Sequence, residues 1–358
     1  MNICFIIGTL NYSGAEKIAR YLIEQMHYHY HYNMSVILVS GQKISSGDMG
    51  YVKQYLIEKK HNKIIDVICR QRQIRTIVTQ GRFDVVVSFG VKYNLDVMEA
   101  LKHTKARVIL CERNDPVNDP HRLILRIRRK LCYKYASGYV FQTDKIADFF
   151  GGKIKSRGTV IPNFIEKKQE VFYSSSTGNN IVVTARLDDV QKNISMLLQA
   201  FSEFSKEYDY MLYIVGNGPD EKKFKDLAAE LGVSNKVVFT GRKNVYDYLK
   251  HAQIYVLPSN YEGMPNSLIE AMSVGIPCIA TDCSGGGSAY LIDDHVNGTL
   301  IPVQSKDRLV CALKELADDP ILREKYSVEA YKINEKLCFD TIIGQWIAYI
   351  EKVGGKVS

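Results

Sequence analysis

The chain has 358 residues, of which 46% are hydrophobic and 24% are charged. The chain is longer than a typical domain with a single hydrophobic core, and its composition is that of a globular protein. We therefore expect two domains of roughly 150–200 residues. Residues 1–165 hold 26 Lys and Arg against 13 Asp and Glu, a net +13, whereas residues 166–358 hold 21 against 26, a net −5. A basic half joined to a mildly acidic half suggests that one domain faces an anionic surface, with solvated lysine and arginine as the alternative.

The cysteines and the apolar runs indicate the compartment in which the protein works. The eight cysteines include no Cys-x-x-Cys pair and no zinc spacing, which favours buried thiols in a reducing compartment. The first residues carry no basic leader, and no stretch reaches the roughly 18–20 apolar residues of a spanning helix. We therefore expect a cytoplasmic protein.

The N-terminal half alternates short apolar runs with segments of helical spacing. Expected strands span 3–7, 34–39, 83–87, 107–110 and 138–142. Residues 41–62 are polar and predict irregular structure, and 64–78 predict the start of another strand-and-helix unit. A glycine-bearing loop after the first strand leads to a helix that starts near Gly14 and Glu16, a place that suits an anion or, equally, hydroxyl groups.

Residues 121–135 are the most basic segment, with six Arg or Lys interleaved with five Leu or Ile. At about 100° per residue the apolar positions cover a broad face, which predicts a helix with a basic flank. Such a helix can lie against anionic lipid, where each basic residue contributes about 1 kcal/mol. A core helix with a solvated basic edge is the alternative.

The polar segment 166–180 is expected to link the halves, and the strand–helix alternation then resumes. Expected strands span 181–184, 211–215, 237–239, 254–257, 278–280 and 299–301, and expected helices lie near 194–207, 220–231, 244–250, 266–274 and 306–317. The pattern predicts an α/β fold of two facing Rossmann-like doubly wound domains, 1–165 and 166–340. Residues 341–358 are expected to form a helix that packs back on the N-terminal domain.

An acidic turn lies between the strands at 254–257 and 278–280. Glu262 falls in a loop at a strand's C-terminal end, and Glu270 in the early turns of a helix that Asn266 or Ser267 can cap. Open α/β sheets bind ligands at that edge, so both carboxylates are expected to face one crevice. Each carboxylate can accept two hydrogen bonds from a diol, which suits hydroxyl groups better than phosphates.

Positive charge follows the first strand of the second half. Arg186 offers a planar fork of donors, Lys192 a compact charge, and Asn193 can cap the next helix. Together with a helix N-terminus they predict a clamp for a diphosphate, with surface salt bridges as the alternative.

Small-residue turns follow the next two strands. Gly216 and Gly218 would let the backbone approach a ligand, and the turn at Gly241 and Arg242 leaves room for a flat base. The G-x-G-x-x-G spacing of a dinucleotide fingerprint is absent, and plain connecting turns are the alternative.

Six motifs follow one another along the chain. They are Gly14-Ala-Glu16, Cys111-Glu-Arg-Asn-Asp-Pro116, Val160-Ile-Pro-Asn163, Arg186 with Lys192-Asn193, Gly216-Asn-Gly-Pro219, and Glu262-Gly-Met-Pro with Glu270-Ala-Met272. The set resembles the retaining glycosyltransferases of family four, which have the GT-B fold, over nearly the whole chain. The paired glutamates preceded by the basic clamp are the specific part.

The resemblance implies roles for particular residues. Arg186 and Lys192 would hold the donor diphosphate, and Glu262 would orient the donor sugar, which makes these three the expected catalytic group. The expected donor-binding residues are Gly14, Glu16, Gly216, Gly218, Gly241, Arg242, Gly263, Met264, Pro265, Asn266 and Glu270, the last on the ribose hydroxyls. Glu112 and Arg113 would face the acceptor. Since the family needs no obligatory metal, we expect no metal site and no cofactor besides the nucleotide-sugar substrate.

The implied reaction moves a hexose or N-acetylhexosamine from a UDP-sugar to a lipid-linked or growing surface-glycan acceptor. Fixed cations would stabilise the departing diphosphate, which can itself take the acceptor's proton. The basic half favours a protein peripheral on the inner face of the cytoplasmic membrane. Two segments depart from the family: Ser88-Phe-Gly90 lacks a histidine that many relatives carry, and 282–290 lacks the usual proline and acid.

Two other functions remain open from the sequence. A UDP-sugar epimerase also uses two facing α/β domains but needs no acceptor. A basic nucleic-acid binder is less consistent with the residues, because the arginines lack interleaved aromatics and no recognition motif is present. We therefore expect no nucleic-acid partner.

Overall fold

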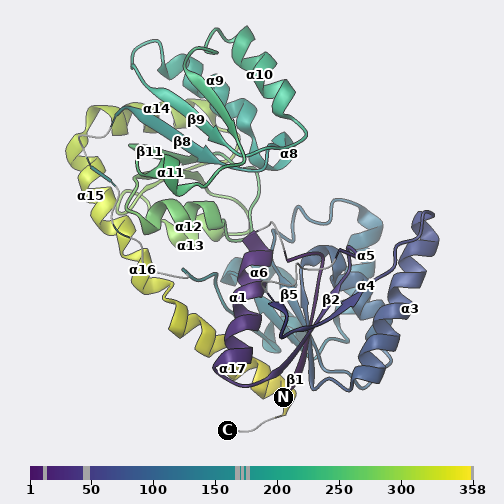
Figure 1. Ribbon diagram of the computed structural model, residues 1–358. Coiled ribbons are helices and arrows are strands. Elements are labelled where there is room, and N and C mark those ends of the chain that lie inside the picture. The colour runs from purple at the N-terminus through teal and green to yellow at the C-terminus, as the bar shows by residue number, and fades with distance from the viewer. Residues whose placement is uncertain (11–13, 43–48, 166–169, 171–172, 175–177, 356–358) are drawn as a thin grey trace. The chain divides into compact units, whose positions relative to one another are not determined.

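The structure is a computed structural model that describes residues 1–10, 14–42, 49–165, 170, 173–174 and 178–355. The chain forms two compact units, an N-terminal domain of Met1–Phe164 with Asp340–Ser358 and a C-terminal domain of Ile165–Phe339. Each unit is built on a parallel sheet with helices on both faces, so the predicted α/β fold class is confirmed (Figure 1). Most of the expected linker lies outside the described residues.

The N-terminal sheet has seven parallel strands in the order β3-β2-β1-β4-β5-β6-β7. The strands are β1 (Asn2–Ile7), β2 (Asn33–Leu38), β3 (Lys53–Leu56), β4 (Val85–Phe89), β5 (Val108–Glu112), β6 (Gly138–Phe141) and β7 (Gly158–Val160). The helices are α1 (Gly14–Tyr28), α3 (Lys63–Gly81), α4 (Val91–Leu101), α5 (Leu123–Tyr133), α6 (Asp144–Phe150), α7 (Gly152–Ser156) and α17 (Phe339–Gly354).

Two predictions for this domain are wrong. The segment 41–62 contains β3, an edge strand whose residues are exposed or half-buried and therefore give no apolar run. The segment 64–78 contains no strand, because α3 begins at Lys63 and the Asn62 side chain caps it by accepting from Ile64 N and Ile65 N.

Successive side chains of each strand point to opposite faces of the sheet and form an apolar layer on each face. Ile6 and Ile37 pack with Ile74 of α3 on one face. On the opposite face the Phe89 ring lies 5.9 Å from the Trp346 ring of α17, which lies beside the first elements of the chain in Figure 1. The C-terminal helix thus completes the N-terminal core.

The C-terminal sheet has six parallel strands in the order β10-β9-β8-β11-β12-β13. The strands are β8 (Asn180–Thr184), β9 (Met211–Val215), β10 (Val237–Gly241), β11 (Ile254–Leu257), β12 (Cys278–Thr281) and β13 (Thr299–Ile301). The helices are α8 (Asp189–Lys192), α9 (Ile194–Phe204), α10 (Glu221–Glu230), α11 (Tyr246–Leu249), α12 (Asn266–Ser273), α13 (Gly287–Leu291), α14 (Lys306–Asp318), α15 (Pro320–Tyr331) and α16 (Ile333–Lys336).

The direction of strand addition reverses between β8 and β11, and this reversal fixes where a ligand can bind. The chain winds outward from β8 to β10, then returns to β11 on the other side of β8. Open α/β sheets bind ligands at such a switch point, outside the carboxyl ends of the strands. Every residue of β11 and β12 is buried because helices cover both faces, which is why continuous apolar runs predicted these strands.

Candidate active site

The loops that follow β8 and β11 are joined side by side at the switch point. Asn260 N donates to Gln191 O over 2.7 Å, and the Asn260 side chain donates to Val190 O over 3.0 Å. In return the Gln191 side chain donates to Tyr261 O over 3.3 Å. These bonds hold α8 against the acidic turn, so the two predicted parts of the site are fixed to one another.

An ion pair between Lys192 and Glu262 completes this junction. Lys192 Nζ contacts Glu262 Oε1, which also accepts from the Ser259 hydroxyl over 2.8 Å. The two charged side chains are only 16% and 8% exposed, so each needs the other as a partner. Glu262 Oε2 has no hydrogen-bond partner within the described chain and remains able to accept from a ligand.

Arg186 lies in a different setting. It follows β8 by two residues, its side chain is 64% exposed, and its guanidinium pairs with Asp188. An exposed pair of this kind contributes no more than about 1 kcal/mol, so it gives little resistance to exchange for another anion. The structure therefore supplies one half-buried and one accessible cation next to β8.

Asn193 does not cap α9, so that prediction is wrong. Its backbone is left-handed at φ 51°, and its side chain makes no capping bond. The Asp189 carboxylate caps the start of α9 instead, because it accepts from Ser195 N over 2.9 Å and from the Ser195 hydroxyl over 2.7 Å. Burial raises the pKa of Asp189, but hydrogen bonds from Lys223 and Ser195 outweigh it and hold the pKa below its usual range.

The glycines after β9 serve a close approach to the segment that carries Arg186. A Cβ on Gly216 would lie 1.9 Å from Ala185 O, and one on Gly218 would lie 2.3 Å from Leu187 O. Gly216 also has φ +145°, which disfavours other residues. The predicted small-residue requirement therefore has a structural cause, since the turn supports the backbone on either side of the arginine.

The turn after β10 closes the same edge. Gly216 N donates to Gly241 O over 3.0 Å, so the ends of β9 and β10 meet there. Arg242 follows as an exposed side chain.

The helix after the acidic turn starts differently from the prediction. α12 begins at Asn266, but its N-cap is Pro265, which is extended and offers no capping side chain. The carbonyl of Pro265 accepts from Leu268 N and Ile269 N over 3.2 Å. Glu270 is the fifth residue of α12 and half-buried, so its place in the early turns of the helix agrees with the prediction.

The acidic turn is supported from behind by β12 and α13. Thr281 Oγ1 donates to Ser259 O over 2.5 Å. Gly287 lies so close that a Cβ there would be 1.9 Å from Gly263 O, and Met264 is buried. The sequence analysis did not single out Thr281 or Gly287, since neither side chain carries a charge and neither belongs to a motif.

In the N-terminal domain Glu112 is an interior residue. Its Oε1 accepts from the Tyr133 hydroxyl over 2.5 Å and from the Asn94 side chain over 3.1 Å, and the residue has no exposed surface. Burial raises the pKa of Glu112 to about 7. A residue in this position supports the loop after β5 from within.

Arg113, the next residue, carries donors that are not used. Its guanidinium lies 4.7 Å above the Phe89 ring, and one nitrogen contacts Asn163. The Nε and Nη1 atoms are buried and have no partner in the described part of the chain, and burial lowers the pKa of Arg113 to about 10. Buried donors are nearly always paired, so these two are an exception within the loop after β5.

The first loop of this domain is only partly described, because residues 11–13 lie outside the described ranges. Gly14 is the first residue of α1. Glu16 accepts from the Thr9 hydroxyl and is half-buried. A Cβ on Gly8 would lie 2.9 Å from the Tyr93 ring, so the start of the loop packs closely on α4.

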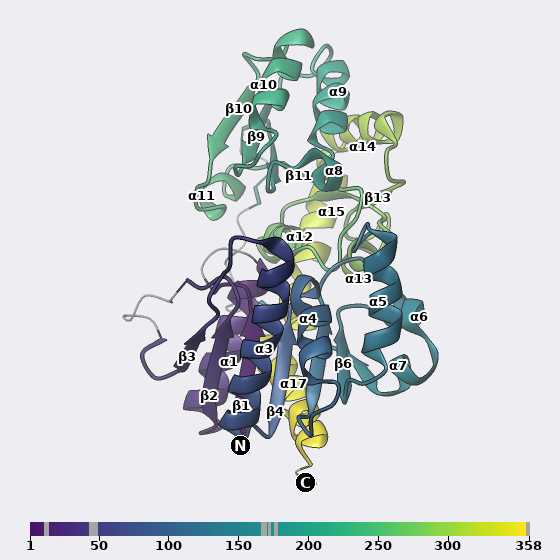
Figure 2. The same cartoon turned by 90° about the vertical axis from the view of Figure 1, so that its right-hand side faces the viewer.

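α5 packs on the core through Cys132 and Tyr133, whereas its outward face carries both aliphatic and basic side chains. Arg129 points inward and donates to Asp119 O and Pro116 O, each over 2.8 Å. The aliphatic side chains that face solvent are Leu123, Ile124, Ile127 and Leu131, which are 48–72% exposed. Basic residues adjoin them at Arg122, Arg126, Lys130 and Lys134. Figure 2 shows α5 at the outside of its domain.

Within the described residues two kinds of feature are absent. No group of three or more His, Cys, Asp or Glu side chains there could hold a metal ion. No helix within the same ranges is long and apolar enough to cross a membrane.

Residues 164–333 match the family described as glycosyl transferases group 1. An uncharacterized glycosyltransferase of Methanocaldococcus jannaschii is 28% identical over 262 residues, which is 64% of each chain. A Campylobacter jejuni relative is 25% identical over 371 residues and 99% of both chains. It is named a GalNAc-α-(1→4)-GalNAc-α-(1→3)-diNAcBac-PP-undecaprenol α-1,4-N-acetyl-D-galactosaminyltransferase.

Solved structures give the same fold at low identity. The lipopolysaccharide outer core galactosyltransferase WaaB in its apo form superposes with a TM-score of 0.79 at 19% identity, covering 98% of this chain and 99% of that one. Anabaena HepE in complex with UDP-glucose gives 0.79 at 17% identity, covering 97% and 98%. With the two-sheet architecture, these matches support a GT-B glycosyltransferase whose C-terminal domain carries the glycosyl transferases group 1 region.

Proposed function

We propose that the protein is a retaining family-four glycosyltransferase that moves a hexose or N-acetylhexosamine from a UDP-sugar to a lipid-linked or growing surface glycan. The single observation that carries the proposal is the Lys192–Glu262 ion pair at the switch point, with Arg186 on the same loop. The bound UDP-glucose of the Anabaena neighbour supports the donor class. The undecaprenol-linked glycan in the name of the Campylobacter relative supports the acceptor class.

The geometry suits departure of a diphosphate. Breaking the anomeric C–O bond develops negative charge on the diphosphate, which fixed cations stabilise more in the transition state than in the ground state. Lys192 is already oriented by Glu262, and Arg186 exchanges its exposed partner Asp188 for phosphate oxygens at little cost. In this proposal the departing diphosphate takes the proton of the attacking hydroxyl, and Lys192 and Arg186 stabilise its charge in place of a metal ion.

Glu262 is suited to hold the sugar. Its Oε1 is saturated by Lys192 and Ser259, which leaves Oε2 to accept from a sugar hydroxyl. In the same proposal Glu270 accepts from the ribose hydroxyls, while the turns at Gly216, Gly218, Gly241 and Arg242 border the nucleotide. The segment Gly263, Met264, Pro265 and Asn266 holds the two glutamates in sequence along one loop and helix.

Acceptor binding is assigned to the loop after β5. The two unused donors of Arg113 offer hydrogen bonds to oxygen atoms of an acceptor diphosphate or glycan. Glu112 supports this loop from the interior rather than contacting the acceptor.

The face of α5 is assigned to the membrane. Its four exposed aliphatic side chains each stabilise insertion by up to about 2 kcal/mol when they leave water, and each neighbouring cation adds about 1 kcal/mol near anionic lipid. The protein would then be peripheral on the inner face of the cytoplasmic membrane, where lipid-linked acceptors are exposed.

The test is incubation of the full chain with a panel of UDP-sugars, with and without a membrane lipid extract, while UDP release and sugar incorporation are measured. Lipid-dependent UDP release with one donor is expected. Absence of release with every donor would overturn the proposal. Sugar conversion without any acceptor would instead indicate the epimerase, which none of the comparisons favours.

A further inference from the structure

A pocket lies in the N-terminal domain at the edge of the sheet opposite to Glu112 and Arg113. Its volume is about 390 Å³. Asn2, Asn33 and Lys53 line it and are the first residues of β1, β2 and β3, whereas Glu112 is the last residue of β5. Because all these strands are parallel, the pocket and the loop after β5 lie at different edges of one sheet.

The pocket exists because the sheet extends beyond its helical cover. Asn33, Ser35 and Ile37 alternate onto one face of β2, and Ile37 packs against the core beneath α3. α3 ends at Gly81, and the chain turns away through Arg82, which is left-handed at φ 46°. The polar ends of three strands therefore remain open where a helix would otherwise cover them.

Asn2 and Asn33 bond to one another in this pocket, whereas Ser35 and Lys53 do not pair with its other polar groups. Ser35 is 7% exposed, yet its hydroxyl has no hydrogen-bond partner within the described residues. Lys53 has no carboxylate partner in the same ranges, and its ammonium lies 5.0 Å from the centre of the Tyr55 ring. No Asp or Glu lines the pocket. The Ser35 hydroxyl and the Lys53 ammonium can therefore both donate to a ligand that accepts hydrogen bonds.

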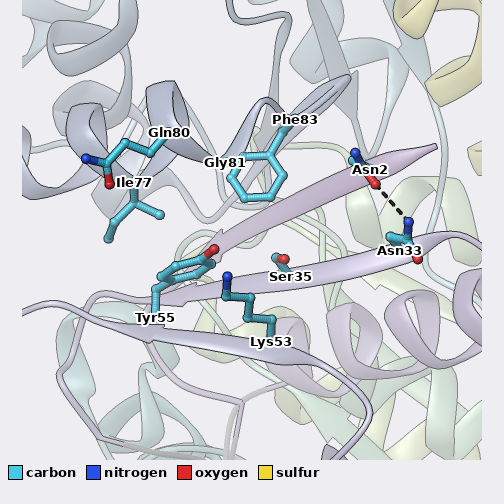
Figure 3. Close-up of a pocket in the computed structure, with 9 residues that line it drawn as sticks. All are labelled: Asn2, Asn33, Ser35, Lys53, Tyr55, Ile77, Gln80, Gly81 and Phe83. Atoms are coloured by element: carbon cyan, nitrogen blue, oxygen red, sulfur yellow. Dashed lines mark hydrogen bonds between the residues drawn. The ribbon is translucent and has the colours of Figure 1, made fainter.

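Two aromatic side chains form the apolar corner of the pocket. The Tyr55 and Phe83 rings are 6.5 Å apart and nearly perpendicular, at 84°. A Cβ on Gly81 would lie 2.3 Å from the Phe83 ring, so the ring packs directly on the backbone at the end of α3. Figure 3 shows Ser35 and Lys53 between this corner and the hydrogen-bonded pair of Asn2 and Asn33.

Aromatic surface beside hydroxyl, amide and ammonium groups matches the two sides of a saccharide, whose C–H groups are apolar and whose hydroxyls both donate and accept. The volume falls in the range of small-molecule sites. We propose that this pocket is an accessory site that binds one saccharide unit of a glycan chain. The ligand class rests on the proposed function, since an enzyme that extends a glycan meets such a chain at every turnover.

The test is ligand-observed saturation-transfer NMR and calorimetry with maltotriose, tri-N-acetylchitotriose and trigalacturonate, on the full chain without donor. We expect at least one of the three to bind. Lys53→Glu should weaken that binding about tenfold by removing the exposed ammonium, and Gly81→Ala should do so by displacing Phe83. Lys59→Glu changes the same charge on an exposed residue outside the pocket and should leave binding unchanged.

Two outcomes would overturn the accessory site: binding of none of the three saccharides, or equal binding by wild type and Lys53→Glu. UDP release from the donor panel is measured in parallel and separates the two proposals. Release without saccharide binding contradicts the accessory site alone, whereas saccharide binding without release from any donor contradicts the proposed transferase.

Discussion

Lys192 and Glu262 form an ion pair across the topological switch point of the C-terminal sheet, between residues 70 positions apart in the chain. The pair joins the loop after β8 to the loop after β11, which three further hydrogen bonds also connect. A cation needed for the leaving group is thus oriented by a carboxylate suited to the sugar. The same contact contributes to both the stability and the chemistry of the site.

Lys192 and Arg186 should respond differently to alanine substitution. Lys192→Ala leaves Glu262 buried without its partner, so it should lower the free energy of unfolding by up to about 3 kcal/mol as well as UDP release. Arg186→Ala removes an exposed pair, so its melting temperature should stay near that of wild type while UDP release falls about 10²-fold or more. Thermal unfolding and a UDP assay check both. Wild-type activity of Arg186→Ala would remove it from the site.

Gly218 should not tolerate a methyl group. Gly218→Ala brings Cβ within 2.3 Å of Leu187 O, which should shift the segment that carries Arg186 and reduce both stability and UDP affinity. Gly344→Ala is the matched control, since its Cβ meets nothing within 4 Å in helix α17, and it should be neutral or stabilising by up to about 1 kcal/mol. Calorimetry with UDP and thermal unfolding measure the difference. Equal behaviour of the two variants would contradict the packing argument.

The buried carboxyl of Glu112 should make stability depend on pH. Because burial raises its pKa to about 7 in the folded state, the folded protein binds more protons than the unfolded chain between about pH 4.5 and about pH 7. This contribution is complete below the unfolded pKa and is lost as the pH rises through about 7, by at most about 1.4 kcal/mol per pH unit.

Glu112→Gln keeps the acceptor oxygen for Tyr133 but cannot titrate. The free energy of unfolding of wild type minus that of the variant should therefore fall between about pH 5 and about pH 7 in urea titrations. A difference that is independent of pH would show that Glu112 is charged throughout.

The exposed face of α5 should govern membrane binding. Ile124→Glu with Ile127→Glu should reduce flotation of the protein with vesicles that contain anionic phosphatidylglycerol, because the change places carboxylates among the basic residues. Ile321→Glu alters an equally aliphatic residue that is 81% exposed on α15, and should float like wild type. Flotation that is unchanged in the α5 variant would contradict the assignment.

Much of the fold could be predicted from the sequence because helices cover both faces of each sheet. Strands such as Ile254–Leu257 are continuous apolar runs and were placed within one or two residues. The edge strand Lys53–Leu56 was missed, since it lies at the margin of the sheet and has no buried residue. The sequence also does not show which face of α5 packs inward. The buried face includes an arginine, Arg129, whereas aliphatic side chains lie on the outward face.

The candidate site was predictable as a set of residues but not as a set of contacts. Local motifs identified Arg186, Lys192 and Glu262, and adjacency of β8 and β11 brings the last two together. The capping role given to Asn193 failed because that residue is left-handed, a property that side-chain chemistry does not reveal. The unused donors of Arg113 likewise depend on burial, which the sequence does not report.

The most direct test of the central claim is calorimetric UDP binding combined with UDP-sugar turnover for wild type, Glu270→Ala and Glu262→Ala. If the switch point of the C-terminal sheet is the donor site, Glu270→Ala should weaken UDP binding about tenfold or more by removing the ribose contact. Glu262→Ala should also lower the melting temperature, because it removes the partner of Lys192, but the folded variant keeps both cations of the clamp and should still bind UDP while losing most of its turnover. Absence of UDP binding by wild type, or equal binding and turnover in all three proteins, would contradict the account.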